Sequence, residues 1–209
     1  MNNAADTRDA PSPVFRIVVI CTGNRFRSPL VEAFIGRLTA GLPVEVSSRG
    51  ALELGGAPPL EGAVKGATKL GFDISGHRSR CLRNSDLRDV DLVLGFERAH
   101  VSQAVVDCGA RKERTFTLPE LLDLLEALPD PDPKDTTEPV QRARTALERA
   151  AQYRRPREGK PLPELADPLG ASDRVQRDTV RRLHEASAAL VRHLFGVLPA
   201  AAERKIARG

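Results

Sequence analysis

Short apolar runs that are typical of buried strands alternate along this chain with segments of helical periodicity. The first run, residues 14–20, is rich in β-branched side chains, as expected for a strand that is buried on both faces. Because parallel strands need long crossover connections, which are usually helices, the alternation predicts an α/β fold built on a parallel sheet. Further strands are predicted over 44–48, 90–94 and 114–118, and helices after residue 28 and over 60–70, 97–106, 120–127, 140–153 and 172–195.

The length of 209 residues suits one domain with a sizeable core, which we place at residues 14–198. Residues 1–13 are polar, of mixed charge and closed by two prolines, so we expect a flexible N-terminal tail, and residues 199–209 are expected to form a C-terminal tail. Over 129–163 two Pro-rich stretches flank one helical segment. This composition predicts an insertion within the domain.

Composition and cysteine content argue against several classes of protein. No apolar run approaches the roughly 20 residues that span a bilayer, and the N-terminus lacks a signal-peptide pattern, so neither membrane insertion nor export is expected. The net charge of +4 is spread along the chain, and an aromatic content of 4% leaves little to stack on bases, so nucleic acid is not an expected partner. Three cysteines cannot all pair and offer no CxxC spacing, which favours a reducing cytoplasm and no metal site.

Residues 21–29, Cys-Thr-Gly-Asn-Arg-Phe-Arg-Ser-Pro, join the first strand to a helix. Ser28 is the expected N-cap of this helix, with Pro29 at its first position. In such a turn successive backbone N–H groups point into one concavity, and the positive end of the helix dipole stabilises an anion there. The segment therefore predicts a phosphate-binding loop made of Thr22, Gly23, Asn24, Arg25, Phe26 and Ser28.

The same surroundings favour the thiolate of Cys21, which is the nucleophilic form of the side chain. Arg27, six residues later, can present its planar guanidinium to two phosphate oxygens while a phosphoryl group moves in line. Cys21 is thus the candidate nucleophile and Arg27 the candidate phosphate ligand. The alternative is a buried structural cysteine at a strand end, and the turn and helix start that follow Cys21 argue against it.

The bare spacing of Cys, five residues, Arg and then Ser or Thr occurs a second time, because Arg114 and Thr115 follow Cys108 in the same way. Cys108 ends a predicted helix, and its loop leads into a strand. No helix N-terminus would then face its sulfur. We therefore expect no active site at Cys108.

A thiolate nucleophile needs a partner that protonates the departing oxygen and later helps water to attack. Asp167, which precedes Pro168 in a turn just before the last helix, is the candidate. Taken alone, the Asp-Pro pair is more often an ordinary turn than a catalytic acid.

The chain resembles the low molecular weight protein tyrosine phosphatases, which read Cys-x-Gly-Asn-x-Cys-Arg-Ser-Pro after their first strand. The likeness continues in the family's order through residues 48–50, 77–80 and 91–94, then Glu97 with His100, and finally Asp167-Pro168. It implies a four-stranded parallel sheet flanked by helices on both sides, the Rossmann-like three-layer fold of phosphotyrosine protein phosphatase I. It also implies an enzyme without a cofactor.

By this resemblance Cys21 is the nucleophile, Arg27 binds the phosphate and Asp167 is the general acid. The reaction implied is hydrolysis of phosphotyrosine in proteins through a phosphocysteine intermediate, with a bacterial tyrosine kinase or a polysaccharide-export component as the suggested partner. The resemblance also gives Ser28 the role of hydrogen-bonding the thiolate. The residues that would support the loop from a buried polar network are Asn24, Ser48 and His77.

Four residues depart from the family pattern. Phe26 stands where many members have a second cysteine that protects the nucleophile by a reversible disulfide, so that protection should be absent. Leu169 replaces the tyrosine that is usual after Asp-Pro, which removes an aromatic wall of the cleft. Arg25 and Arg49 add positive charge, so acidic peptides and phosphorylated groups other than phosphotyrosine stay open as ligands.

Two other functions stay open at this point. A thioredoxin-coupled arsenate reductase shares the loop and the fold, but Cys81 and Cys108 are far apart in sequence for the usual disulfide relay. A slow or non-catalytic relative that only binds phosphate or phosphoproteins is the second alternative, suggested by Leu169 and by the insertion at 129–163.

Overall fold

The computed structural model describes residues 13–129, 137–154 and 163–196. Its strands form one parallel sheet in the order β2-β1-β3-β4. Since β2 and β3 lie on opposite sides of β1, the order of the strands reverses there, and α/β proteins bind ligands beyond the carboxyl ends of the strands at such a point. The strands are β1 (Phe15–Cys21), β2 (Val44–Gly50), β3 (Leu92–Gly95) and β4 (Thr115–Thr117).

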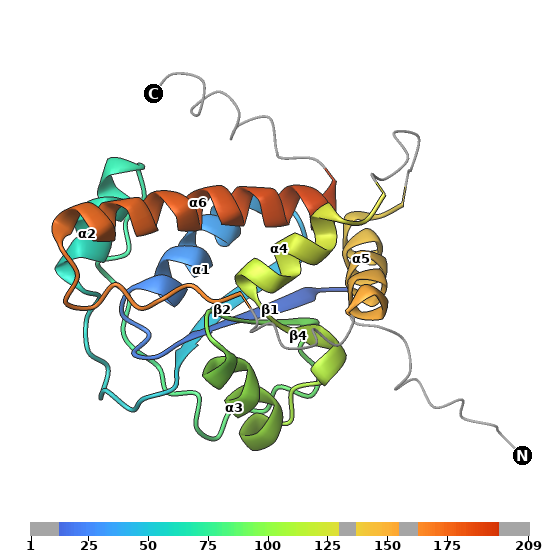
Figure 1. Cartoon of the computed structure of the whole chain (residues 1–209), viewed down its shortest axis with the longest axis horizontal. Helices are drawn as coiled ribbons and strands as arrows, with labels where there is room; N and C mark the ends of the chain where they lie inside the picture. The colour runs from blue at the N-terminus through green and yellow to red at the C-terminus, as the bar shows by residue number, and fades with distance from the viewer. Residues whose placement is uncertain (1–12, 130–136, 155–162, 197–209) are drawn as a thin grey trace, which may run out of the picture.

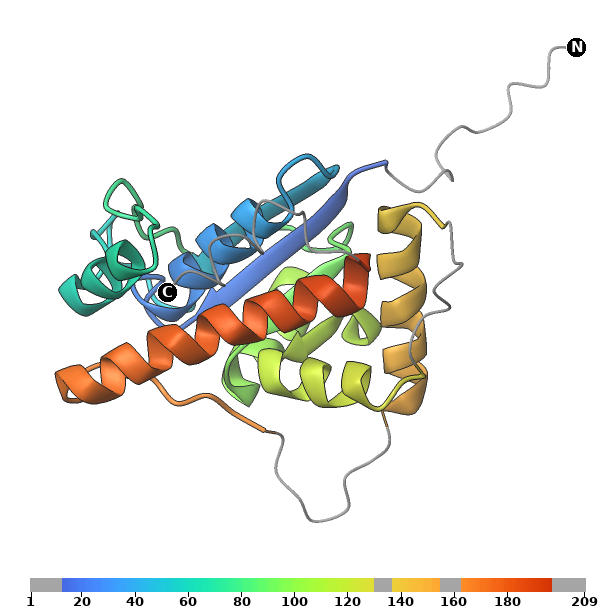
Figure 2. The same cartoon turned by 90° about the horizontal axis from the view of Figure 1, so that it is seen from above.

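Helices cover both faces of the sheet (Figure 1). Seen from above, α6 runs along the sheet beside α1 and α4 (Figure 2), while α3 lies on the opposite face (Figure 1). The predicted fold class, a four-stranded parallel sheet with helices on both sides, is confirmed. The helices are α1 (Arg27–Leu38), α2 (Glu61–Lys69), α3 (Arg98–Cys108), α4 (Leu118–Glu126), α5 (Pro139–Tyr153) and α6 (Asp173–Phe195), with a 3-10 turn at Lys112–Arg114.

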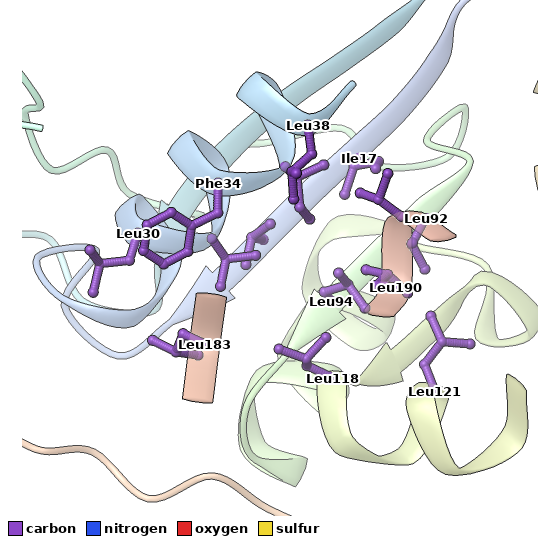
Figure 3. Packing of buried hydrophobic residues seen from close by; sticks show 14 of the residues in the cluster. Ile17, Leu30, Phe34, Leu38, Leu92, Leu94, Leu118, Leu121, Leu183 and Leu190 are labelled. Atoms are coloured by element: carbon purple, nitrogen blue, oxygen red, sulfur yellow. The ribbon is translucent and has the colours of Figure 1, made fainter. Parts of the chain in front are cut away.

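The main core lies between the sheet and the helices α1, α4 and α6 (Figure 3). Ile17 and Leu94 of the sheet meet Phe34 of α1 and Leu183 and Leu190 of α6, and each of these side chains is at most 1% exposed. Burying one such side chain stabilises the fold by about 1.5–3 kcal/mol. This packing fixes the carboxyl end of β1 relative to the start of α1.

A smaller core occupies the opposite face of the sheet. Val18, Ile20 and Val93 alternate with the residues of the main core and pack against Leu82 and Ala104 of the α3 side. A period of two along β1 therefore fills both faces, which is why the strand is apolar at every position except the exposed Arg16.

The helix predicted between 140 and 153 is present as α5 and is tied to the sheet by two arginines. Arg144 donates from Nε to Asp91 Oδ1 over 3.0 Å at the start of β3. Arg154 makes a paired contact with Glu120 of α4, with its Nε and Nη2 at 2.9 and 3.0 Å from the two carboxylate oxygens. Its guanidinium also lies 4.0 Å from the ring centroid of Phe116 in β4. These contacts integrate α5 into the domain.

Replacement of Arg154 by methionine should lower the free energy of unfolding by about 3 kcal/mol, because it leaves a buried carboxylate without its partner. The Glu120 side chain is 4% exposed. The measurement is urea denaturation, with Gln152→Ala as the control, because that exposed side chain lies on the same turn and should change stability by less than about 0.5 kcal/mol. A loss below 1 kcal/mol for Arg154→Met would show that this contact does not hold α5.

The start of α1 differs from the prediction. The helix begins at Arg27, its N-cap is Phe26, and no side chain caps it. The prediction that Ser28 is the N-cap is wrong, because its hydroxyl is drawn into contacts with Cys21 and Asn24. The proposed division into a tail at 1–13, a domain at 14–198, an insertion at 129–163 and a tail at 199–209 remains a proposal, since both tails fall almost entirely outside the described residues.

Candidate active site

The loop between β1 and α1 closes over the carboxyl end of β1. Cys21 is the last residue of the strand and is 3% exposed. Asn24 at the turn has φ of 52°, a left-handed conformation that Asn tolerates better than most residues. An added Cβ at Gly50 would lie 3.0 Å from Asn24 Cβ, so only glycine lets β2 pass this close to the loop.

Several hydrogen-bond donors of this loop are unused in the structure. Within the described part of the chain, the backbone amides of Gly23, Asn24, Arg25 and Phe26 have no hydrogen-bond acceptor. The Arg27 side chain is fully buried, and its Nε also lacks an acceptor among the described residues. Buried donors are almost always paired, so a cluster of free ones beside a cysteine indicates an anion-binding site.

A chain of hydrogen bonds runs to the sulfur of Cys21. Ser28 Oγ lies 3.0 Å from Cys21 Sγ. Asn24 Nδ2 donates to Ser28 Oγ over 2.9 Å and to Ser48 Oγ over 2.7 Å, and the Ser48 hydroxyl donates to Glu32. Because Asn24 is the donor to Ser28, the Ser28 hydroxyl proton is left free to point at the sulfur. That is the direction of donation that a thiolate requires.

Asn24 is held in place by the segment that follows α2. His77 Nε2 lies 2.9 Å from the Asn24 carbonyl oxygen, and the backbone amide of Arg80 donates to Asn24 Oδ1 over 2.8 Å. Burial lowers the pKa of His77 below its ordinary value, although the Asn24 carbonyl and the charge of Glu32 raise it. His77 is therefore neutral near pH 7 and donates from Nε2. Asn24, Ser48 and His77 do come together beside the loop.

Arg27 lies between two carboxylates. Its Nη1 donates to Glu97 and, over 2.8 Å, to the backbone oxygen of Leu165. Its Nη2 donates to Asp167 Oδ2 over 2.5 Å and to Thr22 Oγ1 over 3.1 Å. Both nitrogens at the end of the fork are thus fixed, and Nε is the guanidinium nitrogen that lacks an acceptor among the described residues.

Asp167 reaches the site because its segment is tied to the carboxyl ends of β3 and β4. The Leu165 amide donates to the Phe96 carbonyl over 2.9 Å, and Thr117 Oγ1 donates to the Pro163 carbonyl over 2.8 Å. Glu164 Oε1 accepts a hydrogen bond from the Arg98 amide at the start of α3 over 2.8 Å. These contacts bring Asp167 next to Arg27 although 140 positions separate them.

The residues that depart from the family pattern occupy different places. Phe26 is 3% exposed and packs into the main core, so only its backbone faces the loop. Arg25 is anchored through Nε to the Pro58 carbonyl at 2.7 Å, whereas Leu169 is 69% exposed. Leu54 comes close to the loop, because a Cβ on Gly23 would lie 3.2 Å from its Cδ1.

Cys108 lies away from this loop. It is the last residue of α3 and sits in the smaller core, with its sulfur 3.5 Å from the Leu82 carbonyl oxygen. Burial raises the pKa of the Cys108 thiol, and the charges of Asp107 and Cys81 add to this effect. The turn at Lys112–Arg114 and strand β4 follow it, so its repeat of the spacing lacks a helix N-terminus.

Three residues that contact this machinery were assigned no role from the sequence: Glu32, Glu97 and His100. Glu97 carries a signal that could have found it, because it closely follows the buried strand β3 and so lies at the same sheet edge as Cys21. Glu32 lies on α1 four positions after Ser28, where an acidic side chain is ordinarily a solvated one. Its ion pair with Arg80 could not be read from spacing.

A loop of amides without acceptors, a cysteine and a buried arginine at the switch point of a parallel sheet define an α/β protein with a candidate oxyanion-binding loop. The family model of the low molecular weight phosphotyrosine protein phosphatases matches residues 16–154. The chain belongs to this family, as the sequence resemblance predicted. No helix in the described ranges has the length and apolar character needed to span a membrane.

Individual relatives agree with this assignment. The chain is 32% identical over 136 residues to the low molecular weight protein-tyrosine-phosphatase Etp of Escherichia coli (strain K12). The aligned residues cover 65% of this chain and 89% of Etp. A crystal structure of the low molecular weight protein tyrosine phosphatase from T. tengcongensis superposes with a TM-score of 0.63 at 25% identity, covering 86% of this chain and 99% of the other. The arginine phosphatase YwlE from Geobacillus stearothermophilus shares the fold, with a TM-score of 0.62 at 23% identity over 86% and 92% of the two chains.

Proposed function

We propose that this protein hydrolyses phosphotyrosine in proteins through a phosphocysteine at Cys21. The observation that carries the proposal is the convergence of four free amides and the free Nε of buried Arg27 around the loop that begins at Cys21. These donors match the equatorial oxygens of a transferring phosphoryl group. The curated relative Etp bears the name of a tyrosine phosphatase, which supports the same reaction class.

The first step forms a bond between Cys21 Sγ and phosphorus while the bond from phosphorus to the tyrosine oxygen breaks. Asp167, in its protonated form, gives its proton to the departing oxygen, so tyrosine leaves as a neutral phenol. In the second step water attacks phosphorus, Asp167 takes a proton from that water, and the sulfur–phosphorus bond breaks. Inorganic phosphate and the starting thiolate result.

Arg27 links substrate binding to the position of Asp167. Its Nη2 donates to Asp167 in the structure. A phosphate dianion that binds to the guanidinium competes with the carboxylate for this donor, so substrate binding moves Asp167 away from Arg27 and toward the leaving oxygen. Glu97, which faces the other nitrogen of the fork, keeps Arg27 in place during this exchange.

The partner in this proposal is a phosphoprotein of the cytoplasm, such as the bacterial tyrosine kinase or polysaccharide-export component that the resemblance suggests. The exposed Leu169 and the nearby Leu54 give the cleft an aliphatic rim in place of an aromatic one, and Arg25 adds a positive charge beside the loop. The substrate should therefore combine a phosphorylated ring with acidic neighbours.

A panel of phosphopeptides of matched sequence tests the proposal. Phosphotyrosine should be hydrolysed with the highest kcat/KM, and phosphoserine should be a poor substrate because the short side chain cannot reach the buried sulfur. Phosphoarginine is included because one neighbour of this fold is an arginine phosphatase. Faster turnover of phosphoarginine than of phosphotyrosine would show that the substrates are phosphoarginine proteins. Binding of vanadate without hydrolysis of any peptide would favour the phosphate-binding alternative.

A further inference from the structure

His100 is buried in the site but touches none of the candidate catalytic residues directly. It occupies the third position of α3 and is 2% exposed. Its Nδ1 accepts hydrogen bonds from the backbone amides of Phe96, at 3.3 Å, and Glu97, at 3.2 Å. Because Nδ1 is an acceptor, the proton of the neutral ring must be on Nε2.

The Nε2 proton of His100 points to the phosphate loop. His100 Nε2 lies 3.3 Å from Thr22 Oγ1, and the same oxygen accepts a hydrogen bond from Arg27 Nη2 at 3.1 Å. A hydroxyl oxygen has two lone pairs and one proton. With both lone pairs occupied, the Thr22 hydroxyl keeps its own proton as its remaining hydrogen-bonding group.

The direction of this proton follows from the geometry of the oxygen. Its four tetrahedral positions hold Cβ, the two accepted hydrogen bonds and the proton, so the proton points away from both His100 and Arg27. Thr22 adjoins Cys21 and is partly exposed, unlike its two donors. The remaining direction is therefore the partly exposed side of Thr22, in the loop whose amides lack acceptors among the described residues.

We propose that His100 is a positioning residue which, by donating to Thr22, directs the Thr22 hydroxyl proton at an oxygen of the bound phosphoryl group. This inference rests on the proposed function of the loop. It adds a side-chain donor to the backbone donors of the loop and to Arg27, and it gives the segment that follows β3 a part in phosphate binding. Capping of α3 by His100 accounts for Nδ1 but leaves the contact through Nε2 unexplained.

The mechanism requires the neutral form of His100. A proton on Nδ1 would face the amide protons of Phe96 and Glu97 and would break both contacts. Burial lowers the pKa of His100; the charges of Glu97, Asp167 and Glu164 raise it, whereas that of Arg27 lowers it further. His100 is thus kept neutral at pH 7. Acidification should protonate the His100 ring and break the contacts that hold it. The Thr22 hydroxyl would then no longer be directed at the phosphoryl group.

Three variants, at Thr22 and His100, separate a positioning role from a structural one. Thr22→Val keeps the side-chain shape but removes the hydroxyl, whereas Thr22→Ser keeps the hydroxyl. His100→Asn places an amide oxygen near the position of Nδ1, so it retains the helix cap while losing the donor to Thr22. Loss of a hydrogen bond to a charged group should weaken the affinity for vanadate, measured by calorimetry, and kcat/KM roughly 10- to 100-fold in Thr22→Val and in His100→Asn.

The double variant gives the sharpest result. Because His100 acts through Thr22, Thr22→Val with His100→Asn should be no worse than Thr22→Val alone, and Thr22→Ser should recover most of the vanadate affinity that Thr22→Val loses. Protonation of His100 should lower kcat/KM of the wild type at acidic pH. This titration step should be missing from the pH profile of Thr22→Val. Vanadate affinity tests the inference even if the protein turns over no substrate.

Unchanged vanadate affinity in Thr22→Val, or additive losses in the double variant, would overturn the inference. A fall in melting temperature of His100→Asn with unchanged vanadate affinity would assign His100 a structural role only and would overturn it as well.

Discussion

Cys21→Ser should abolish hydrolysis of para-nitrophenyl phosphate and of phosphotyrosine peptides. A serine hydroxyl in this loop lacks the anionic character of a thiolate, and the side chain that contacts this position among the described residues is Ser28, which is not a base. Removal of a covalent nucleophile in well-studied hydrolases lowers kcat by roughly 10⁶-fold, and we expect a loss of this order, below the detection limit of a standard assay.

The two other cysteines provide matched controls. Cys108→Ser should retain nearly full activity because its side chain lies in the smaller core, at the C-terminal end of α3. Cys81→Ser should also remain active. The fold of Cys21→Ser is checked by its affinity for inorganic phosphate, since the free amides and Arg27 remain in place. Activity that survives in Cys21→Ser but is lost in Cys108→Ser would reverse our assignment of the nucleophile.

Asp167→Asn is expected to lower kcat by about 10²- to 10⁴-fold for phenyl phosphate, whose leaving group needs a proton. The amide is isosteric with the carboxyl group, and its one oxygen can still accept from the Leu169 amide, which lies 3.1 Å from Asp167 Oδ1 and holds the turn, whereas its NH2 group replaces the oxygen that accepts from Arg27. The loss therefore reports proton transfer rather than collapse of the turn. The measurement is kcat of Asp167→Asn and of the wild type for a series of aryl phosphates whose leaving groups differ in pKa.

The dependence on leaving group separates a general acid from an electrostatic role. para-Nitrophenolate departs without a proton, so Asp167→Asn should lose much less activity with para-nitrophenyl phosphate than with phenyl phosphate. Glu164→Gln is the control, because Glu164 lies in the same segment but accepts from the Arg98 amide at the start of α3. Equal losses of Asp167→Asn with both leaving groups would remove Asp167 from the acid role.

The loop from Cys21 to the start of α1 could be predicted because its determinants are local. A buried β-branched strand, a turn with Gly23 and Asn24, and a helix start define it within a dozen residues. The parallel sheet was predictable for a similar reason, since strand and helix periodicities alternate along the chain. The wrong prediction that Ser28 is the N-cap of α1 is equally informative. Its hydroxyl contacts Cys21 and Asn24, and these tertiary contacts replace the local capping hydrogen bond.

The partners of Arg27 could not be predicted in the same way. Glu97 is 70 positions away and Asp167 is 140, so their approach depends on the order of the strands and on the path of the segment before α6. The family resemblance identified Asp167 as the general acid, but it assigned no role to Glu97 or His100. Ion pairs of this kind arise from tertiary packing, which no local pattern contains.

The central claim is that phosphorus becomes bonded to the sulfur of Cys21. Acid quenching of the Asp167→Ala variant during turnover of para-nitrophenyl phosphate, followed by peptide mass spectrometry, measures this directly. We predict one added phosphoryl group on the peptide that contains Cys21, and none on the peptides with Cys81 or Cys108. A phosphoryl group on another residue, or turnover without any covalent adduct in a burst-phase experiment, would contradict the account.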